Sequence, residues 1–367
     1  MTNNARVDND QLEKVIGRLG EAAVDPSLWS EILEAICRAA GASGAVLLQS
    51  DVRTPDVPRT PSIDEATRLY FESSCHVTDP RTRAFPRMMS GEVVTDQDVL
   101  TPEQIRSDPM YNEILRPFGF EWFAGVGFWA GSAFWALTIQ RSGREGRFDA
   151  VDKQILSRLG PRLTETASLA TAVGRAALHS VTNTLQRLEQ PALVLSRSGD
   201  VLGMNAAADA GFDDDIRVSR GQLFLRDKNA RAKLDQTLQA IRWEPDGDAL
   251  PVTPIVVRRA AKPAVVIRIL PIDGAARNVF LGARALLIFS NLLPRAAPNS
   301  RLIAEALDLT PAESRLAELL ARGLSLDLAS SELGISRETA RNQLKSAFFK
   351  TGTHRQSELI SLVHQLR

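Results

Sequence analysis

The chain has little of what marks several protein classes. Its 367 residues include 2 cysteines, Cys37 and Cys75, which are too few for a disulfide framework or a cysteine metal site. This cysteine usage fits a reducing compartment. No apolar run approaches the ~20 residues that a membrane-spanning helix needs. The opening MTNNARVDND lacks the basic start and apolar core of a signal peptide. We therefore expect a cytoplasmic protein without a membrane partner.

The chain also lacks a net charge, because 44 lysines and arginines balance 44 acidic residues. A zero sum does not exclude nucleic acid, since binding depends on where the basic residues lie. The length predicts two or three domains. The sequence has no nucleotide-binding loop, metal-ligand cluster or nucleophile elbow. We therefore expect neither an enzyme nor a metal or other cofactor.

The first block, residues 1–170, mixes helical and strand patterns. Apolar residues at helical spacing predict two helices before residue 40, and Gly44–Gln49 predicts a strand. Two aromatic-rich runs, Trp122–Trp129 and Ala133–Arg141, predict a hairpin, and Asp149 begins a helix. This element order resembles a GAF domain. The resemblance implies a sensor domain of that fold.

A connecting helix is predicted over residues 171–190. Apolar residues recur there and just before it at helical spacing, beyond a Pro161 that breaks or kinks the helix. The stripe consists of Leu163, Ala170, Val173, Ala177, Val181, Leu185 and Leu188. It predicts either a dimer seam or rod between domains, or a helix packed on its own domain. Both interpretations stay open.

The second block, residues 191–293, begins with strands at Ala192–Leu195 and Val201–Met204, joined by a tight turn. Asn205 then caps a short helix. Further strands are predicted at Gln222–Leu225, Val252–Arg258, Ala264–Leu270 and Ala285–Phe289, with a helix near Ala230–Ile241. The hairpin followed by a capped helix resembles a PAS domain. Asn291–Ser300 predicts a linker.

The last block, residues 300–367, carries a dense series of helix signals. Thr310–Glu313 is a capping box with proline at the first helical position, and Gly323 ends that helix. Ser325 caps a second helix, and Ser336 caps a third that runs over Arg337–Lys350. A fourth carries Leu359, Ile360, Val363 and Leu366. Between positions 336 and 355 there are five basic residues and one acidic residue, which is typical of a DNA contact.

This block resembles the LuxR-type (GerE-like) helix-turn-helix family. The matching segments are Leu309–Glu313, Leu320–Ser325, Leu333–Ser336, Thr339, Lys350, Gly352 and Glu358–Leu359. The resemblance implies that Arg341, Asn342 and Lys345 face base edges and that Thr339 and Lys350 lie near phosphates. The candidate DNA-binding set is Ser336, Arg337, Thr339, Arg341, Asn342, Lys345 and Lys350. Ala340, Gln343 and Leu344 depart from the family's usual residues, so a base preference cannot be carried over.

The whole chain is predicted to be α+β. GAF-like and PAS-like sensor domains are followed by an all-α, four-helix LuxR-type domain. The chain resembles bacterial LuxR-type regulators with that layout, which implies a transcriptional regulator that binds double-stranded promoter or operator DNA. A homodimer is expected because helix-turn-helix proteins usually read paired half-sites. The final helix, with Leu359, Ile360 and Val363, is one candidate seam, and the 163–188 stripe is the other. RNA polymerase is a further candidate partner.

The signal is predicted to be a small apolar or aromatic molecule bound by the first block, because aromatic residues concentrate between positions 118 and 135. The candidate ligand residues are Tyr70, Asp79, Phe118, Trp122, Trp129 and Trp135. The aromatic residues would equally well fill a core. Tyr70 and Asp79-Pro80 fit part of an acyl-homoserine-lactone pattern, but Ala66 stands where that pattern has a tryptophan.

Three other functions stay open. The chain could be an acyl-homoserine-lactone-responsive quorum-sensing regulator, or a ligand-independent regulator controlled by protein partners. It could also be an adaptor that uses the last block for protein contact.

Overall fold

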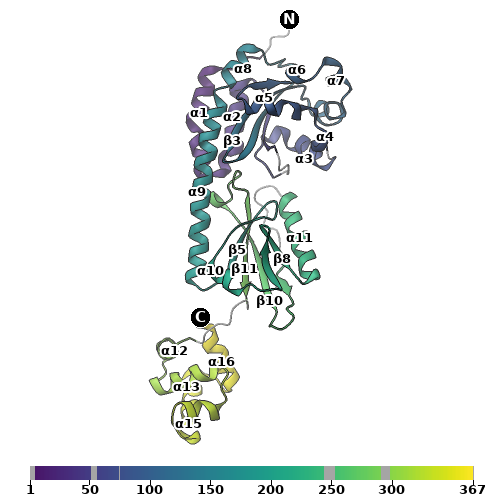
Figure 1. Cartoon of the computed structure of the whole chain (residues 1–367). Helices are drawn as coiled ribbons and strands as arrows, with labels where there is room; N and C mark the ends of the chain where they lie inside the picture. Colours follow the sequence, from purple (N-terminus) through teal and green to yellow (C-terminus); the bar gives the residue numbers. More distant parts are fainter. Residues whose placement is uncertain (1–4, 51–55, 74, 244–252, 291–297, 367) are drawn as a thin grey trace. The chain divides into compact units, whose positions relative to one another are not determined.

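The computed structural model describes residues 5–50, 56–73, 75–243, 253–290 and 298–366 (Figure 1). The chain divides into two compact units, Met1–Leu293 and Pro294–Arg367. The larger unit is α+β with antiparallel sheets, and the smaller one is helical. Among the described residues, every helix falls short of the length and apolar character that a bilayer crossing requires.

The first sheet of the larger unit has the strand order β1-β4-β3-β2, and all its neighbours are antiparallel. The strands are β1 (Gly44–Gln49), β2 (Val93–Thr95), β3 (Trp122–Ala130) and β4 (Ala133–Arg141). The β3–β4 hairpin confirms the prediction for that segment. Since paired residues share a face, Phe128 and Trp135 point to one side of the sheet and Thr138 and Gln140 to the other.

Helices cover both sides of this sheet, but they differ in length. The long ones are α1 (Asn9–Val24), α2 (Trp29–Ala40) and α9 (Leu159–Arg187). The opposite side is covered by shorter elements, including α3 (Asp64–Glu72), α5 (Phe85–Met89) and the π-helix η4 (Met110–Leu115). Other short elements are η1 (Pro26–Leu28), η2 (Pro61–Ile63), α4 (Cys75–Thr78), η3 (Pro80–Ala84), α6 (Asp96–Val99), α7 (Pro102–Ser107), η5 (Arg116–Phe118) and α8 (Ala150–Leu156).

The connecting helix α9 runs along both sheets of the larger unit (Figure 1). It begins at Leu159, so Pro161 lies in its first turn, where the missing N–H removes no helical hydrogen bond. Leu163 and Ala170 are fully buried, and Gly174 packs against the turn η6 (Gly274–Ala276) and Asn278. The first part of the stripe is therefore core. Of the two interpretations, packing on its own domain holds for Leu163 and Ala170, which their own unit covers, so these two residues cannot form a dimer seam.

The second sheet has the strand order β6-β5-β11-β10-β9, again antiparallel. Its strands are β5 (Ala192–Ser196), β6 (Val201–Met204), β9 (Ile255–Val257), β10 (Val265–Pro271) and β11 (Ala283–Ser290). The strands β7 (Ile216–Ser219) and β8 (Gln222–Leu225) form a separate hairpin. The helix α11 (Lys228–Trp243) contacts β8, and the short helix α10 (Ala206–Gly211) contacts β5. The sequence did not predict β7. The predicted start of β9 at Val252, and most of the predicted linker at 291–300, lie outside the described residues.

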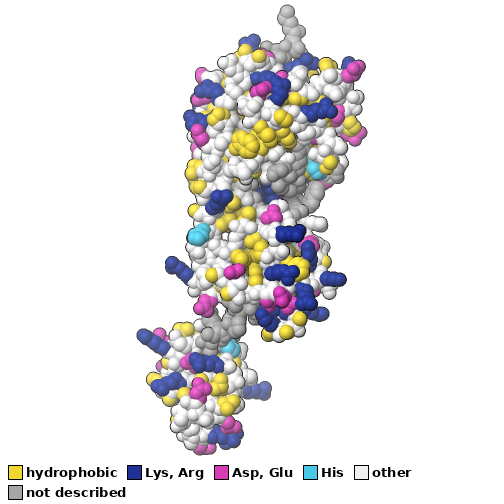
Figure 2. Space-filling model, in the orientation of Figure 1, with side chains coloured by type: hydrophobic (Ala, Val, Ile, Leu, Met, Phe, Trp, Pro, Cys, Tyr) yellow, Lys and Arg dark blue, Asp and Glu magenta, His cyan; other side chains and the backbone are white. Residues whose placement is uncertain are grey.

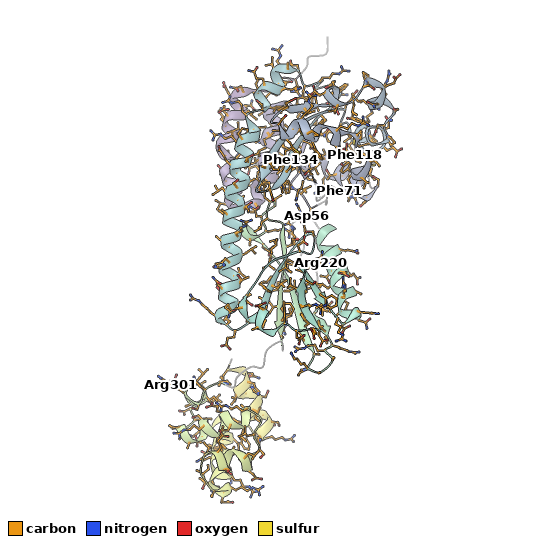
Figure 3. All side chains as sticks on the ribbon, viewed as in Figure 1. Asp56, Phe71, Phe118, Phe134, Arg220 and Arg301 are labelled. Carbon is orange, nitrogen blue, oxygen red and sulfur yellow. The ribbon has the colours of Figure 1, made fainter. Side chains whose placement is uncertain are left out.

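The two sheets of the larger unit are joined by an aromatic contact. Phe280, in the segment between β10 and β11, lies edge-on to Trp29, Phe128 and Trp135 of the first region, with ring centroids 5.6, 5.8 and 5.1 Å away. Asp56, labelled in Figure 3, adds an ionic contact. Its carboxylate pairs with Arg284 on β11 and with Arg277. The two regions therefore share a packed and charged interface.

The smaller unit has five helices within residues 298–366, one more than predicted. They are α12 (Ser300–Leu307), α13 (Pro311–Ala321), α14 (Leu326–Glu332), α15 (Arg337–Thr351) and α16 (Gln356–Gln365). The unpredicted α12 is capped by Asn299, which accepts a 2.8 Å bond from the Leu302 N–H, and it buries Ile303 in the core. The prediction of four helices is therefore wrong, because the segment assigned to a linker already carries a helix cap.

The other signals in this unit are confirmed. Thr310 and Glu313 form the capping box, and Ser325 and Ser336 cap α14 and α15. Gly323 and Gly352 follow their helices with φ of +93° and +65°, which glycine adopts without strain.

The last helix, α16, faces inward. Leu359 is 1% exposed and Val363 is 0% exposed, and both belong to the core of the smaller unit. Ile360 is half-buried against the same core. The prediction that these three residues form a dimer seam is therefore wrong for Leu359 and Val363, which are already covered within one chain.

Candidate functional site

Helix α15 divides its residues between the core and the surface. Ala340, Leu344 and Ala347 are buried, with 0%, 9% and 1% exposure. Arg341 and Lys345 are exposed and lie one helical turn apart, with the exposed Asn342 beside them. Figure 2 shows lysine and arginine side chains on the exposed surface of this unit. One side of α15 thus packs the unit, and the other presents two cations and an amide to solvent.

Burial within α15 also explains the side-chain positions of the three departures from the family pattern, Ala340, Gln343 and Leu344. Ala340 and Leu344 lie in the core, so their side chains affect packing and not an outward contact. Gln343 is half-buried. Two of the three departures therefore say little about which bases an outward face could read.

Arg337, at the first position of α15, is paired with Asp327 on α14. The Arg337 Nε lies 2.7 Å from the Asp327 Oδ1, and both side chains are about three-fifths exposed (61% and 60%). The carboxylate of Asp327 balances the guanidinium of Arg337, so the pair contributes no net charge at the start of α15.

Ser336 and Thr339 are engaged in the N-cap of α15. The Ser336 Oγ accepts the Thr339 N–H at 3.0 Å, and the two hydroxyl oxygens are 2.8 Å apart. Both residues remain exposed at the start of the helix. Their side chains fix where α15 begins and stay within reach of a ligand.

Lys350 has a structural partner that the sequence did not suggest. Its Nζ donates to the Glu313 Oε2 at 2.8 Å, and Glu313 is 6% exposed. The same carboxylate oxygen accepts the Thr310 N–H at 2.7 Å. Burial raises the pKa of Glu313, but the hydrogen bonds from Lys350, Ser346 and Thr310 outweigh it and hold that pKa at about 2. Lys350 therefore ties the end of α15 to the start of α13.

By contrast, Arg341, Asn342 and Lys345 make no side-chain hydrogen bond or ion pair with any described residue. Of the seven predicted DNA-binding residues, the structure thus leaves these three with fully available polar groups. They lie together on one exposed side of one helix.

In the larger unit, Tyr70 and Asp79 lie together. Tyr70 is 6% exposed, and its hydroxyl donates to the Asp79 Oδ2 at 2.8 Å. The Arg81 N–H, Nε and Nη2 also donate to Asp79, at 2.9, 3.1 and 3.0 Å. Burial raises the pKa of Asp79, yet Arg81 and Tyr70 outweigh it, so the net direction is downward. Both carboxylate oxygens are therefore occupied by the chain itself.

The other four predicted ligand residues are not brought together with Tyr70. Trp135 is fully buried and packs against Phe280 on the opposite side of the sheet. Trp129 is 40% exposed, and Trp122 is half-buried with Arg147 over its ring. Phe118 is half-buried in η5. The structure therefore does not gather these aromatic residues around one cavity, and Trp135 serves the core.

The larger unit has two cavities among its described residues. One, of about 650 Å³, lies beside Asp56, whose carboxylate is paired with Arg277 and Arg284. The other, of about 30 Å³, lies on the side of the first sheet that α3 and η4 cover. Its lining includes Tyr70, Arg81 and Gln140, and the Arg81 Nη1 and Gln140 Oε1 have no hydrogen-bond partner among the described residues.

Comparisons with known proteins do not assign a function to these residues. No protein-family model matches the chain, and no curated protein does. Among solved structures, the VqsR LBD domain from Pseudomonas aeruginosa is similar at 16% identity and a TM-score of 0.34, covering 43% of this chain and 94% of that one. The phage VqmA–DPO complex is similar at 16% identity and a TM-score of 0.22, covering 52% and 90%. The E. coli DhaR(N)–DhaL complex is similar at 11% identity and a TM-score of 0.21, covering 76% and 86%. Likeness at this level does not determine what this chain binds.

Sequence reasoning missed Arg81 and Gln140. Both carried a signal that could have been noticed. Gln140 and Thr138 interrupt an apolar run on β4, and β pairing turns both to the side opposite Ile139. Arg81 stands two positions after the Asp79 that the sequence did single out. A buried polar residue at such a position is a candidate for recognition.

Proposed function

We propose that this chain is a DNA-binding transcriptional regulator and that α15 is the helix that enters the major groove. The observation that carries the proposal is the exposed face formed by Arg341, Asn342 and Lys345, opposite the buried Ala340, Leu344 and Ala347. The major groove admits one α-helix. A helix with one packed side and one cationic side suits that geometry.

Each exposed group has a chemical use in the groove. Arginine and lysine donate to the acceptor atoms of guanine, and asparagine can bond adenine through both its amide atoms. The N-terminal end of α15, with Ser336, Arg337 and Thr339, suits a phosphate contact, because helix N-termini favour anions. Lys350 is the weakest member of the set, since Glu313 already holds its ammonium group.

We further propose that the protein acts as a homodimer and that the larger unit senses a small molecule. Helix-turn-helix proteins usually read paired half-sites. Val181 of α9 is 41% exposed, and Leu188, the residue directly after α9, is 71% exposed, so these two residues of the stripe could lie in a dimer interface. An acyl-homoserine lactone is not favoured as the signal, because Asp79 has no unused carboxylate oxygen and Ala66 replaces the expected tryptophan.

DNA binding can be tested with the full chain and a fragment selected from a random DNA pool. Arg341→Ala and Lys345→Ala should each weaken binding to that fragment by about 1–3 kcal/mol if the side chains contact bases. Arg315→Ala is the matched control, because Arg315 is an exposed arginine on α13. Wild-type affinity in both α15 variants would contradict the assignment of this helix.

A further inference from the structure

Helix α15 carries an exposed aromatic residue near its end that has no role in the core. Phe349 is 90% exposed, which makes it the most exposed large apolar side chain among the described residues. Its neighbour Phe348 packs partly against the core of the smaller unit, whereas Phe349 lies outside that core. Single apolar residues are common on protein surfaces, so the position of Phe349 decides what it can bind.

Phe349 lies on the same side of α15 as the residues proposed to read bases. Residues four apart on a helix lie one above the other, so Arg341, Lys345 and Phe349 form one row. Asn342 borders this row, and the buried residues of α15 lie on the opposite side of the helix. Phe349 therefore extends the exposed polar face by one turn and adds an apolar group to it.

The spacing along α15 suits a contact with bases. The recognition helix of a homeodomain reads bases through side chains that are spread over about two helical turns. Asn342 and Phe349 are likewise two turns apart, with Lys345 between them. One turn rises about 5.4 Å and successive base pairs lie about 3.4 Å apart, so Phe349 meets a base pair about two steps from the one that Lys345 meets.

The chemistry of the major groove leaves one partner for a phenyl ring. Phenylalanine has no hydrogen-bonding atom, so it gains nothing from the donors and acceptors of guanine, adenine and cytosine. Thymine alone presents an apolar group there, the C5-methyl. A second copy of the chain is disfavoured as the partner of this face, because its Arg341 and Lys345 would meet the same cations of the first copy.

We propose that Phe349 contacts the methyl group of a thymine in the major groove and so makes the chain select thymine at one position of its operator. This contact rests on the proposed DNA-binding function and deepens it. It adds an apolar specificity-determining residue to the polar ones at Arg341, Asn342 and Lys345.

Replacement of thymine by uracil tests the contact, because uracil lacks only the methyl group. The full chain is bound to a fragment selected from a random DNA pool, and each thymine of that fragment is replaced in turn by deoxyuridine. Fluorescence anisotropy measures each affinity. At one thymine or more, the replacement should weaken binding by the wild-type chain about fourfold, which is the gain expected from burying one methyl group.

Variants at position 349 test whether this residue senses the methyl group. Phe349→Ala should bind the thymine fragment about tenfold more weakly and should bind the thymine and uracil forms equally, because the two groups act as a pair. Phe349→Leu keeps an apolar contact and should keep part of the methyl effect. The salt dependence of binding should not change, since no charge is removed. Leu302→Ala, at an exposed apolar site on α12, is the control and should retain wild-type affinity and the full methyl effect.

Four results would overturn the contact with thymine. They are wild-type binding that is insensitive to uracil at every thymine, a full methyl effect in Phe349→Ala, wild-type affinity in Phe349→Ala, and a lowered melting temperature or altered oligomeric state in that variant. The last would show that the ring serves the fold or a second copy. In all four cases, Arg341→Ala and Lys345→Ala still test DNA binding independently. A chain that binds no DNA would overturn both proposals, so the two failures are distinguishable.

Discussion

At the scale of single residues, Lys350 and Glu313 form the pair that joins α15 to α13 in the smaller unit. The two residues are 37 positions apart, so no local pattern relates them. The family resemblance predicts a phosphate contact for Lys350, whereas the structure gives it a nearly buried carboxylate as partner. Removing the lysine would leave Glu313 buried and charged, which costs more than a surface pair contributes.

Lys350→Ala should therefore destabilise the smaller unit by roughly 1–3 kcal/mol. Hydrogen exchange of the α13 and α15 amides in the full chain measures this local stability. Lys345→Ala is the matched control, because Lys345 is exposed and makes no ion pair with the described residues. Equal protection in the two variants would show that the Lys350–Glu313 pair does not hold the helices together.

The same pair predicts how the smaller unit responds to acid. The pKa of Glu313 is lowered from 4.5 to about 2 in the folded protein. A lowered carboxyl pKa contributes stability that is present above pH 4.5 and is lost as the pH falls towards 2. The protection factors of the α13 amides, which are exchange rates corrected for the intrinsic pH dependence of exchange, should therefore fall across this window, and Glu313→Gln should remove that fall. A Glu313→Gln variant with the wild-type pH profile would contradict this account.

At the scale of elements, the sequence predicts helix boundaries, because these depend on residues that are close together in the chain. Capping boxes and glycine ends located α13, α14 and α15 because each signal lies within a turn of the helix that it bounds. The fold of the first region of the larger unit depends on distant residues instead. The side of the sheet that each aromatic residue faces follows from the β3–β4 register, and Phe280, which lies far along the chain, covers Trp135. No local pattern shows that Trp135 lies in the core, so its role as a ligand residue stays a prediction.

Close packing of α5 on β3 gives a prediction for Gly127. A Cβ at this position would lie 2.6 Å from the Met88 carbonyl oxygen and 2.6 Å from the Phe134 ring. Gly127→Ala should therefore destabilise the larger unit by about 1–3 kcal/mol, measured by urea unfolding. Gly203→Ala on β6 is the control, because a Cβ there meets nothing within 4 Å. Similar unfolding midpoints in the two variants would show that α5 can move away from the sheet freely.

At the scale of the whole molecule, Phe280 joins the two regions of the larger unit. Its ring contacts Trp29, Phe128 and Trp135, so the second region completes the core of the first. The helix α9 supports this arrangement by packing on β3 near its start and on β5 near its end. Packed side chains therefore connect the first region to the second, so a shift of the Trp29, Phe128 or Trp135 side chains acts directly on Phe280.

Phe280→Ala should destabilise the first region by roughly 2–4 kcal/mol and separate the unfolding of the two regions. Calorimetry together with tryptophan fluorescence measures this, since Trp29 and Trp135 both contact Phe280. Phe224→Ala is the control, because Phe224 is half-buried on β8 beside Arg217 and Arg231. If both variants shift the fluorescence transition equally, the two regions are not coupled through Phe280.

The central claim is that the smaller unit binds DNA through the exposed cations of α15. Its most direct test is the affinity of the full chain for genomic DNA fragments, measured as a function of salt concentration. The logarithm of the binding constant should fall linearly with the logarithm of salt, because bound counterions are released from the phosphates. The double variant Arg341→Ala, Lys345→Ala removes the two exposed cations of α15 that have no partner among the described residues, so it should weaken this binding at low salt. An affinity that is absent, or that does not change with salt, would contradict the claim and favour an adaptor that contacts protein.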